Sequence, residues 1–272
     1  MARRREVTKQ RGRRRQTKRI LNCLPSPKQE EDWRYEHAAA AEIVAARVSL
    51  PSSRDLREDW WAIADQGQTG SCVGWASADS VCRWHFVKAA RLDQKHLLSP
   101  RFIWMAAKET DRFNTRPTTF IESEGTSLKT ALDVARKFGL VLNRYLAFAS
   151  GKLYRGEAQT FYALAARRKI TAYFNLDRNL SQWRSWLATK GPILTRLDVD
   201  ATWDDATFTN GNLDDYQADT IRGGHAVALV GYTPDRFIVR NSWGTSWGDK
   251  GFAYASLSYA QAAFTEAYGI EV

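Results

Sequence analysis

The sequence predicts an α+β fold in which a helical lobe precedes a β lobe. Two observations carry this prediction. Between residues 72 and 139, apolar side chains recur at spacings of three and four, which is the period of an amphipathic helix. From residue 170 onward the pattern changes to short apolar and β-branched runs, which indicates strands. We therefore expect a cleft between an N-terminal helical lobe and a C-terminal antiparallel β lobe, with the active site in that cleft.

Three helices are expected in the first lobe. The first begins at or just before Cys72 and extends for about 18 residues, and Pro100 opens the second. The third follows Ser127 and stops at Gly139, because glycine readily adopts the backbone conformation that ends a helix. The apolar face of the first helix consists of Trp75, Ala78, Cys82, Phe86 and Ala89.

The second lobe is expected to contain strands with one short helix among them. Its clearest feature is a β-hairpin, in which two apolar runs, 226–232 and 236–240, are joined by a Thr-Pro-Asp turn. The runs 170–174 and 193–197 predict two further strands, and 180–189 predicts a helix between them.

The positive charge of the chain is concentrated at its N-terminus. Residues 1–20 hold eight Arg, two Lys and one Glu, a net charge of +9, so the other 252 residues carry only +1 of the total of +10. Residues 1–22 are therefore predicted to be a basic, disordered tail: a solvated tail, a transit peptide, or a weak contact with nucleic acid or an anionic surface. The body itself shows no excess of basic charge.

A linker or pro-segment, residues 23–49, follows the tail. Two prolines punctuate its start, and the Ala-rich stretch from Trp33 to Ala46 predicts a helix. Pro and Ser directly after Leu50 mark a boundary, so residues 50–272 are expected to form the globular domain.

The composition excludes several classes of protein. Three Cys cannot form a disulfide framework, and the N-terminus lacks the apolar core of a signal peptide, which favours the cytoplasm. No apolar run of about 18 residues predicts a membrane span, no Cys/His spacing predicts a metal site, and no phosphate-binding loop predicts a nucleotide. We expect a monomer without cofactors. Packed or solvated side chains without a chemical role are expected at Cys23, Cys82, His37, His85 and His96.

Three residues suggest nucleophilic catalysis. Cys72 stands at the predicted start of a helix, where the helix dipole and free backbone N–H groups favour a thiolate. His225 and Asn241 begin and end the predicted hairpin, so pairing of its strands brings them close together. A thiol nucleophile requires a base and a group that orients the base, and these two side chains suit those roles.

At these residues the chain resembles the papain family of cysteine peptidases. The match includes a Gly-Ser-Cys sequence ending at Cys72, with His and Asn far downstream, and Gln66 six residues before the Cys. It also includes the sequence NSWGTSWG at 241–248, followed by Gly251 and Phe252. Together these matches span residues 50–272. The resemblance implies a papain-like two-lobe fold and a peptidase that acts on proteins or peptides.

The resemblance also implies roles for individual residues. Cys72 would be the nucleophile, His225 the general base and then acid, and Asn241 the group that orients the imidazole. Gln66 and the Cys72 backbone N–H would stabilise the oxyanion. Substrate-binding positions would be Gly70, Ser71, Gly125, Gly224 and Trp243, with Trp243 also shielding the Asn–His contact from water.

Two positions depart from the usual family pattern. Thr69 stands where a disulfide Cys is common, and Val73 follows the nucleophile where an aromatic residue is common, which is typical of disulfide-poor bacterial members. Two other functions use or retain the same site: an acyl transferase or transpeptidase, and a catalytically inactive protein-binding module.

Overall fold

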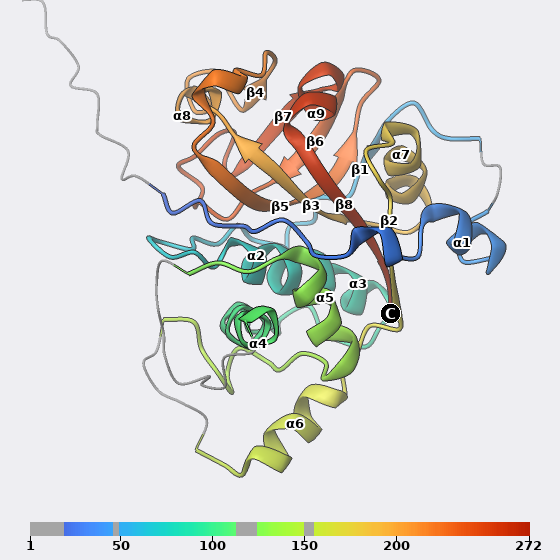
Figure 1. Cartoon of the computed structure of the whole chain (residues 1–272), viewed down its shortest axis with the longest axis vertical. Helices are drawn as coiled ribbons and strands as arrows, with labels where there is room; N and C mark the ends of the chain where they lie inside the picture. Colours follow the sequence, from blue (N-terminus) through green and yellow to red (C-terminus); the bar gives the residue numbers. More distant parts are fainter. Residues whose placement is uncertain (1–18, 46–48, 113–123, 150–154) are drawn as a thin grey trace, which may run out of the picture.

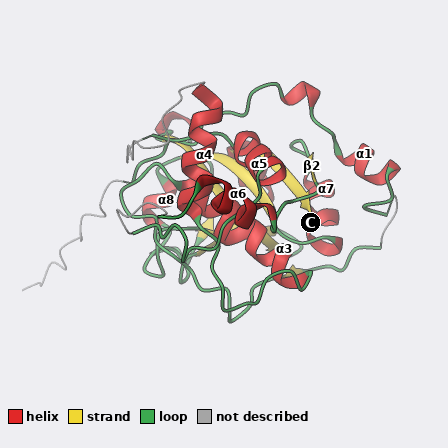
Figure 2. Ribbon diagram, turned by 90° about the horizontal axis from the view of Figure 1, so that it is seen from below, coloured by secondary structure: helices red, strands yellow, loops and turns green. Residues whose placement is uncertain are grey.

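The computed structural model describes residues 19–45, 49–112, 124–149 and 155–272. It confirms the α+β prediction. A sheet of mostly antiparallel strands forms one layer and a group of helices the other, and the N-terminal segment runs along the boundary between them (Figure 1). Seen from the helical side, α4 and α6 lie in front of the strands (Figure 2). The helix predicted at Cys72 therefore packs directly beneath the sheet that carries His225.

The helical layer contains the three predicted helices and one that was not predicted. The first is continuous from Cys72 to Lys88, as α2 (Cys72–Gly74), a π-helical stretch (Trp75–Cys82) and α3 (Arg83–Lys88). The next two are α4 (Pro100–Arg112) and α5 (Leu128–Lys137), and the additional helix is α6 (Ala158–Ala166). The N-terminus of α5 is capped by Ser127, whose side chain accepts a hydrogen bond from the Thr130 N–H.

The described strands form one sheet in the order β2-β8-β3-β5-β6-β7-β4, with β1 paired to β5. Neighbouring strands are antiparallel except for β4 and β7, which are parallel. The strands are β1 (Arg54–Asp55), β2 (Ala172–Asn175), β3 (Ile193–Val199), β4 (Asn212–Leu213), β5 (Gly223–Tyr232), β6 (Arg236–Arg240), β7 (Phe252–Ser256) and β8 (Phe264–Glu271). Three further helices lie between these strands in the sequence: α7 (Leu180–Thr189), α8 (Thr202–Asp205) and α9 (Leu257–Ala263).

The predicted hairpin is confirmed as β5 and β6. Ala228 pairs with Arg240, and the register shifts between Leu229 and Gly231. His225 lies near the start of β5, and Asn241 directly follows β6, so the antiparallel register brings both to the same end of the hairpin.

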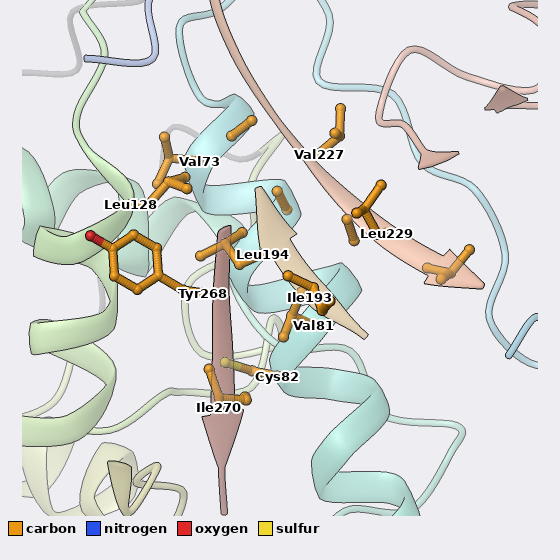
Figure 3. Packing of buried hydrophobic residues seen from close by; sticks show 14 of the residues in the cluster. Val73, Val81, Cys82, Leu128, Ile193, Leu194, Val227, Leu229, Tyr268 and Ile270 are labelled. Atoms are coloured by element: carbon orange, nitrogen blue, oxygen red, sulfur yellow. The ribbon is translucent and has the colours of Figure 1, made fainter. Parts of the chain in front are cut away.

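The first helix packs its apolar side chains against three strands of the sheet. Val73, Val81 and Cys82 of the helix face residues of β3, β5 and β8, and all of them are buried (Figure 3). The strand residues that complete this contact are Ile193, Leu194, Val227, Leu229, Tyr268 and Ile270. Because burying one such side chain contributes about 1.5–3 kcal/mol, this contact fixes the position of Cys72 relative to β5.

The N-terminal segment differs from its prediction in two ways. The helix predicted over Trp33–Ala46 is confined to α1 (Tyr35–Ala40), because Glu42 has a left-handed φ of 59° and the Ile43 N–H bonds back to Ala38. Residues 19–22, which were assigned to a disordered tail, lie against the body, and Arg19 forms an ion pair with Asp65. Residues 1–18 lie outside the described part of the chain.

None of the helices that the structure describes is long and apolar enough to cross a membrane. Within the same described ranges, no group of three or more His, Cys, Asp or Glu side chains is arranged to hold a metal ion.

Candidate active site

Cys72 is buried at the start of the first helix. Its side chain is hydrogen-bonded to that of Cys23, and it also contacts His225 and the backbone N–H of Ala226. The hydrogen bond from Cys23, together with the hydrogen bond and positive charge of His225, lowers the pKa of the Cys72 thiol well below its usual value although burial opposes this. The local structure therefore favours a thiolate at Cys72.

The imidazole of His225 is held by Asn241. Its Nε2 lies 2.8 Å from Asn241 Oδ1, and the same oxygen accepts the Ser242 backbone N–H at 2.8 Å. Because Nε2 is engaged, Nδ1 is the nitrogen available to the thiol, and it is buried without a hydrogen-bond partner of good geometry among the described residues. The Trp243 ring covers the imidazole, with 4.8 Å between ring centroids, and is itself 5% exposed.

Gln66, six residues before Cys72, is held in place by hydrogen bonds to Ser242 and Thr69. Its backbone N–H donates to the Ser242 carbonyl (2.8 Å), its side-chain Oε1 accepts from the Ser242 hydroxyl (2.8 Å), and its Nε2 donates to the Thr69 carbonyl (2.9 Å). An amide nitrogen carries two hydrogens, so Nε2 retains one donor beyond the bond to Thr69. The bond to Ser242 ties Gln66 to the chain that follows Asn241.

The segment 22–24 lies across the two glycines predicted to bind substrate. Asn22 and Leu24 form isolated parallel bridges with Gly224 and Ser127, and the Cys23 N–H donates to the Gly224 carbonyl at 2.9 Å. A Cβ atom at Gly125 would lie 1.4 Å from the Asn22 carbonyl oxygen, so only glycine permits this approach. Gly70 and Ser71 are buried beside Cys72 as well.

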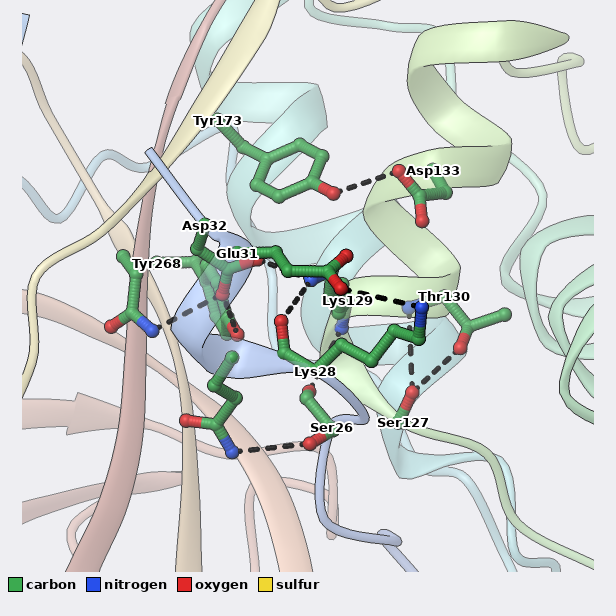
Figure 4. Close-up of polar contacts among 12 residues, drawn as sticks. Ser26, Lys28, Glu31, Asp32, Ser127, Lys129, Thr130, Asp133, Tyr173 and Tyr268 are labelled. Carbon is green, nitrogen blue, oxygen red and sulfur yellow. Dashed lines mark hydrogen bonds and ion pairs between the residues drawn. The ribbon is translucent and has the colours of Figure 1, made fainter. Parts of the chain in front are cut away.

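Residues 26–32 are anchored by a buried polar cluster between α5 and the sheet (Figure 4). Asp32 accepts hydrogen bonds from the Tyr268 hydroxyl (2.8 Å) and the Asn175 amide (3.2 Å), and it forms an ion pair with Lys129. The Lys129 ammonium also donates to the Lys28 carbonyl at 2.7 Å. Further contacts join the Ser26 N–H to Glu266 (2.9 Å) and the Lys129 N–H to the Ser26 hydroxyl (3.1 Å).

Arg19 anchors the N-terminal end of the same segment to the body. Its guanidinium donates to Asp65 at 2.6 Å, to the Gly67 carbonyl at 3.0 Å and to the Trp243 carbonyl at 3.1 Å. It also lies 5.9 Å from the Trp243 ring centroid. The chain from Arg19 to Asp32 is thus fixed on both sides of Cys72, which is 0% exposed.

Cys23 was not predicted to take part in the site. The sequence analysis treated it as a packed or unreactive thiol, and the structure places it, 2% exposed, in hydrogen-bonding contact with Cys72. No sequence pattern links the two thiols, because Cys23 reaches Cys72 through the path of an extended segment and not through a shared helix or strand.

At Thr69, one of the two departures from the family pattern, hydrogen bonds shape the loop before Cys72. The Thr69 hydroxyl donates to the Gln66 carbonyl at 2.8 Å and pairs with the Ser71 hydroxyl at 2.6 Å. Val73, the other departure, is buried in the core. The described cysteines 23, 72 and 82 are all free thiols.

Comparison with known proteins identifies what this arrangement resembles. Residues 50–269 match the model of the papain family of cysteine proteases. The chain is 27% identical over 232 residues to cathepsin B-like CP3 of Giardia intestinalis, which covers 80% of this chain and 73% of that protein. It is 38% identical over 222 residues to cathepsin L1 of Drosophila melanogaster, which covers 77% of this chain and 55% of that protein.

Solved structures show the same fold. Xylellain, a cysteine protease from Xylella fastidiosa, superposes with a TM-score of 0.75 at 22% identity, over 96% of this chain and 99% of that one. A procathepsin B from Trypanosoma congolense superposes with a TM-score of 0.66 at 16% identity, over 93% and 86% of the two chains. The papain-like two-lobe fold is therefore confirmed.

Proposed function

The chain belongs to the papain family and is a cysteine peptidase, and from this premise we propose that Cys72, His225, Asn241 and Gln66 form its catalytic site. The observation that carries the proposal is the pairing of His225 Nε2 with Asn241 Oδ1 at 2.8 Å, which leaves the other imidazole nitrogen for a thiol whose pKa is lowered. This is the geometry that a thiol nucleophile with an oriented base requires.

In the proposed reaction the Cys72 thiolate attacks the carbonyl carbon of a peptide bond. The oxyanion is stabilised by the free hydrogen of Gln66 Nε2 and by the Cys72 backbone N–H. His225 donates a proton to the leaving amine, which gives a thioester between Cys72 and the acyl part of the substrate. His225 then removes a proton from water, which attacks the thioester and releases the acid product.

Labelling by an epoxide inhibitor of thiol proteases tests this assignment. Peptide mapping should find the label on Cys72, and Cys72→Ala should lose both labelling and peptide hydrolysis. Cys82→Ala is the matched control, because burial raises the pKa of Cys82 to about 12 and leaves it as an unreactive thiol. Hydrolysis that persists in a folded Cys72→Ala variant would overturn the assignment.

We further propose that the segment before Leu50 is an inhibitory pro-segment. It covers Cys72, yet the carbonyl of Cys23, the residue beside the nucleophile, is engaged elsewhere than at the oxyanion donors. The Cys23 carbonyl accepts from Arg196 Nε at 3.0 Å, whereas Gln66 Nε2 donates to Thr69. A peptide bond held in this way blocks the site and is not itself in position for attack.

Three chains that begin at Met1, Leu21 and Leu50 separate the contributions of this segment. Peptidase activity should be highest in the Leu50 chain, because it lacks every contact from Arg19 to Asp32. The Leu21 chain should be intermediate, since it loses the Arg19 contacts with Asp65, Gly67 and Trp243 but keeps those of residues 22–32. Equal activity in all three chains would exclude an inhibitory role.

The same chains test the proposed partner of the basic tail. Retention of the Met1 chain on DNA should weaken steeply with salt, because phosphate neutralisation releases counterions. The Leu50 chain, whose net charge is +3 against +10 for the full chain, should not be retained at low salt. Retention of the Leu50 chain would place the basic contact in the body instead. All three chains should elute as monomers in size-exclusion chromatography.

A further inference from the structure

We propose that Cys23 and Cys72 form a reversible disulfide when the protein is exposed to hydrogen peroxide, which links the N-terminal segment to the nucleophile. The proposal rests on the proposed role of Cys72 as the reactive thiol. The proposal makes Cys23 a site of oxidative modification and gives the N-terminal segment a redox function in addition to covering Cys72.

The positions of the two thiols carry the inference. Their side chains are hydrogen-bonded to each other, and both are buried. The backbone of Cys23 is fixed on both sides, since its N–H donates to the Gly224 carbonyl (2.9 Å) and its carbonyl accepts from Arg196 (3.0 Å). Because the two thiols interact directly, rotation of their side chains is the movement that would bring the sulfur atoms to the length of a disulfide bond, about 2.0 Å.

The two thiols also differ in the way that the reaction requires. Contacts with His225 and the Ala226 N–H stabilise a thiolate at Cys72. Burial and the neighbouring Cys72 instead raise the pKa of Cys23, so Cys23 keeps its proton. A thiolate is the form that peroxide oxidises, and a neighbouring thiol is the group that resolves the product.

The reaction balances in two steps. In a molecule whose segment has lifted, the Cys72 thiolate attacks one oxygen of hydrogen peroxide, and the O–O bond breaks to give the sulfenic acid and hydroxide, which takes up a proton to become water. When the segment returns, the Cys23 sulfur attacks the Cys72 sulfur and displaces the hydroxyl group. The Cys23 proton leaves with it as a second water, and the disulfide is complete.

Such a disulfide would protect the enzyme from permanent damage. Without a resolving thiol, further peroxide converts a sulfenic acid to a sulfinic acid, which ordinary thiol reductants do not reverse. The tether keeps Cys23 at an effective concentration of about millimolar near Cys72, so the second step competes with further oxidation. A thiol reductant would then restore the free nucleophile.

The experiment treats the full chain with a small excess of hydrogen peroxide and follows it by intact mass, non-reducing peptide mapping and peptidase activity. The native chain should lose two hydrogens, yield one cross-linked peptide that contains Cys23 and Cys72, and lose activity that dithiothreitol restores. The Cys23→Ala variant should gain two oxygens at Cys72 and lose activity that dithiothreitol does not restore. Cys82→Ala is the control and should behave as the native chain.

Two results would overturn the proposal: no Cys23–Cys72 peptide in the oxidised native chain, or recovery in dithiothreitol that is the same for the native chain and Cys23→Ala. The cross-link is read by mass and does not depend on turnover. If Cys72 were not the catalytic nucleophile, the cross-link could still form while activity persisted, so failure of the proposed function is distinguishable from failure of this inference.

Discussion

His225 Nε2 and Asn241 Oδ1 lie 2.8 Å apart although 16 residues separate them in sequence. The distance is set by the register of β5 on β6, in which Ala228 pairs with Arg240. The core contact between the first helix and β3, β5 and β8 then places Cys72 next to this pair. The candidate Cys–His–Asn group is thus assembled from the start of the first helix and one end of the β5–β6 hairpin.

Replacing Asn241 should impair catalysis less than replacing the nucleophile. Asn241→Ala removes the acceptor for His225 Nε2, so the imidazole loses its orientation but remains present. Loss of an orienting group in a related triad costs roughly 100-fold less than loss of the nucleophile. Steady-state kinetics should therefore show measurable turnover in Asn241→Ala and none in Cys72→Ala. Asn241→Asp keeps an acceptor oxygen and should retain more activity than Asn241→Ala. An Asn241→Ala variant that is folded and wholly inactive would contradict this ranking.

Replacing Gln66 should lower the rate of the chemical step. Gln66→Ala removes one donor to the oxyanion, and such a loss typically costs about 10²- to 10³-fold in kcat. KM should change little, because the donor acts mainly on the charge of the transition state. Ser242→Ala is the control, since it removes the hydroxyl that bonds Gln66 Oε1 and leaves the donor in place. A larger loss in Ser242→Ala than in Gln66→Ala would show that the role of Gln66 is structural.

Weakening the anchor at Asp32 should raise the basal peptidase activity of the full chain. Asp32→Asn removes the charge that pairs with Lys129, and breaking a buried ion pair costs about 3–5 kcal/mol. Because 1.4 kcal/mol is a factor of ten, even part of this cost should raise the uncovered population at least about tenfold. Glu31→Gln is the control, because Glu31 pairs with Lys28 at the exposed surface. Unchanged activity in Asp32→Asn would argue against inhibition by the segment.

His85 should make the fold less stable in acid. Burial lowers its pKa from 6.5 to about 4, while its Nε2 bonds the Pro192 carbonyl at 3.2 Å. Between these values the unfolded chain binds a proton that the folded chain does not, so the free energy of unfolding falls as the pH drops from 6.5 toward 4. The loss attributable to His85 approaches about 3 kcal/mol. Urea unfolding at pH 7 and pH 4.5 should show a smaller acid loss in His85→Gln than in the native chain, and equal losses would refute the assignment.

Local patterns were sufficient to predict the elements that carry the candidate site. Apolar spacing after Cys72 predicted the first helix, and the helix over 180–189 matches the bounds of α7. The hairpin at 226–240 followed from two β-branched runs and a turn. In these segments the local preference and the tertiary packing agree, so sequence alone was sufficient.

Features that depend on distant contacts were not predicted. The strand β8 completes the sheet between β2 and β3, yet its sequence follows an Ala-rich helix without a turn signal. The Ala-rich stretch after Trp33 has a helical pattern, but the chain turns at Glu42 and the helix ends early. The Cys23–Cys72 contact depends on the path of the N-terminal segment, which periodicity does not encode.

The most direct test of the account is to trap the covalent intermediate. The full chain and the Leu50 chain are mixed with an aryl ester of a short peptide, quenched in acid within milliseconds and digested for mass spectrometry. We predict an acyl adduct on the Cys72 peptide, absent in Cys72→Ala, that accumulates to a higher level in the Leu50 chain than in the full chain. An active preparation that carries the adduct on another residue, or that turns over the ester in the Cys72→Ala variant, would contradict the account.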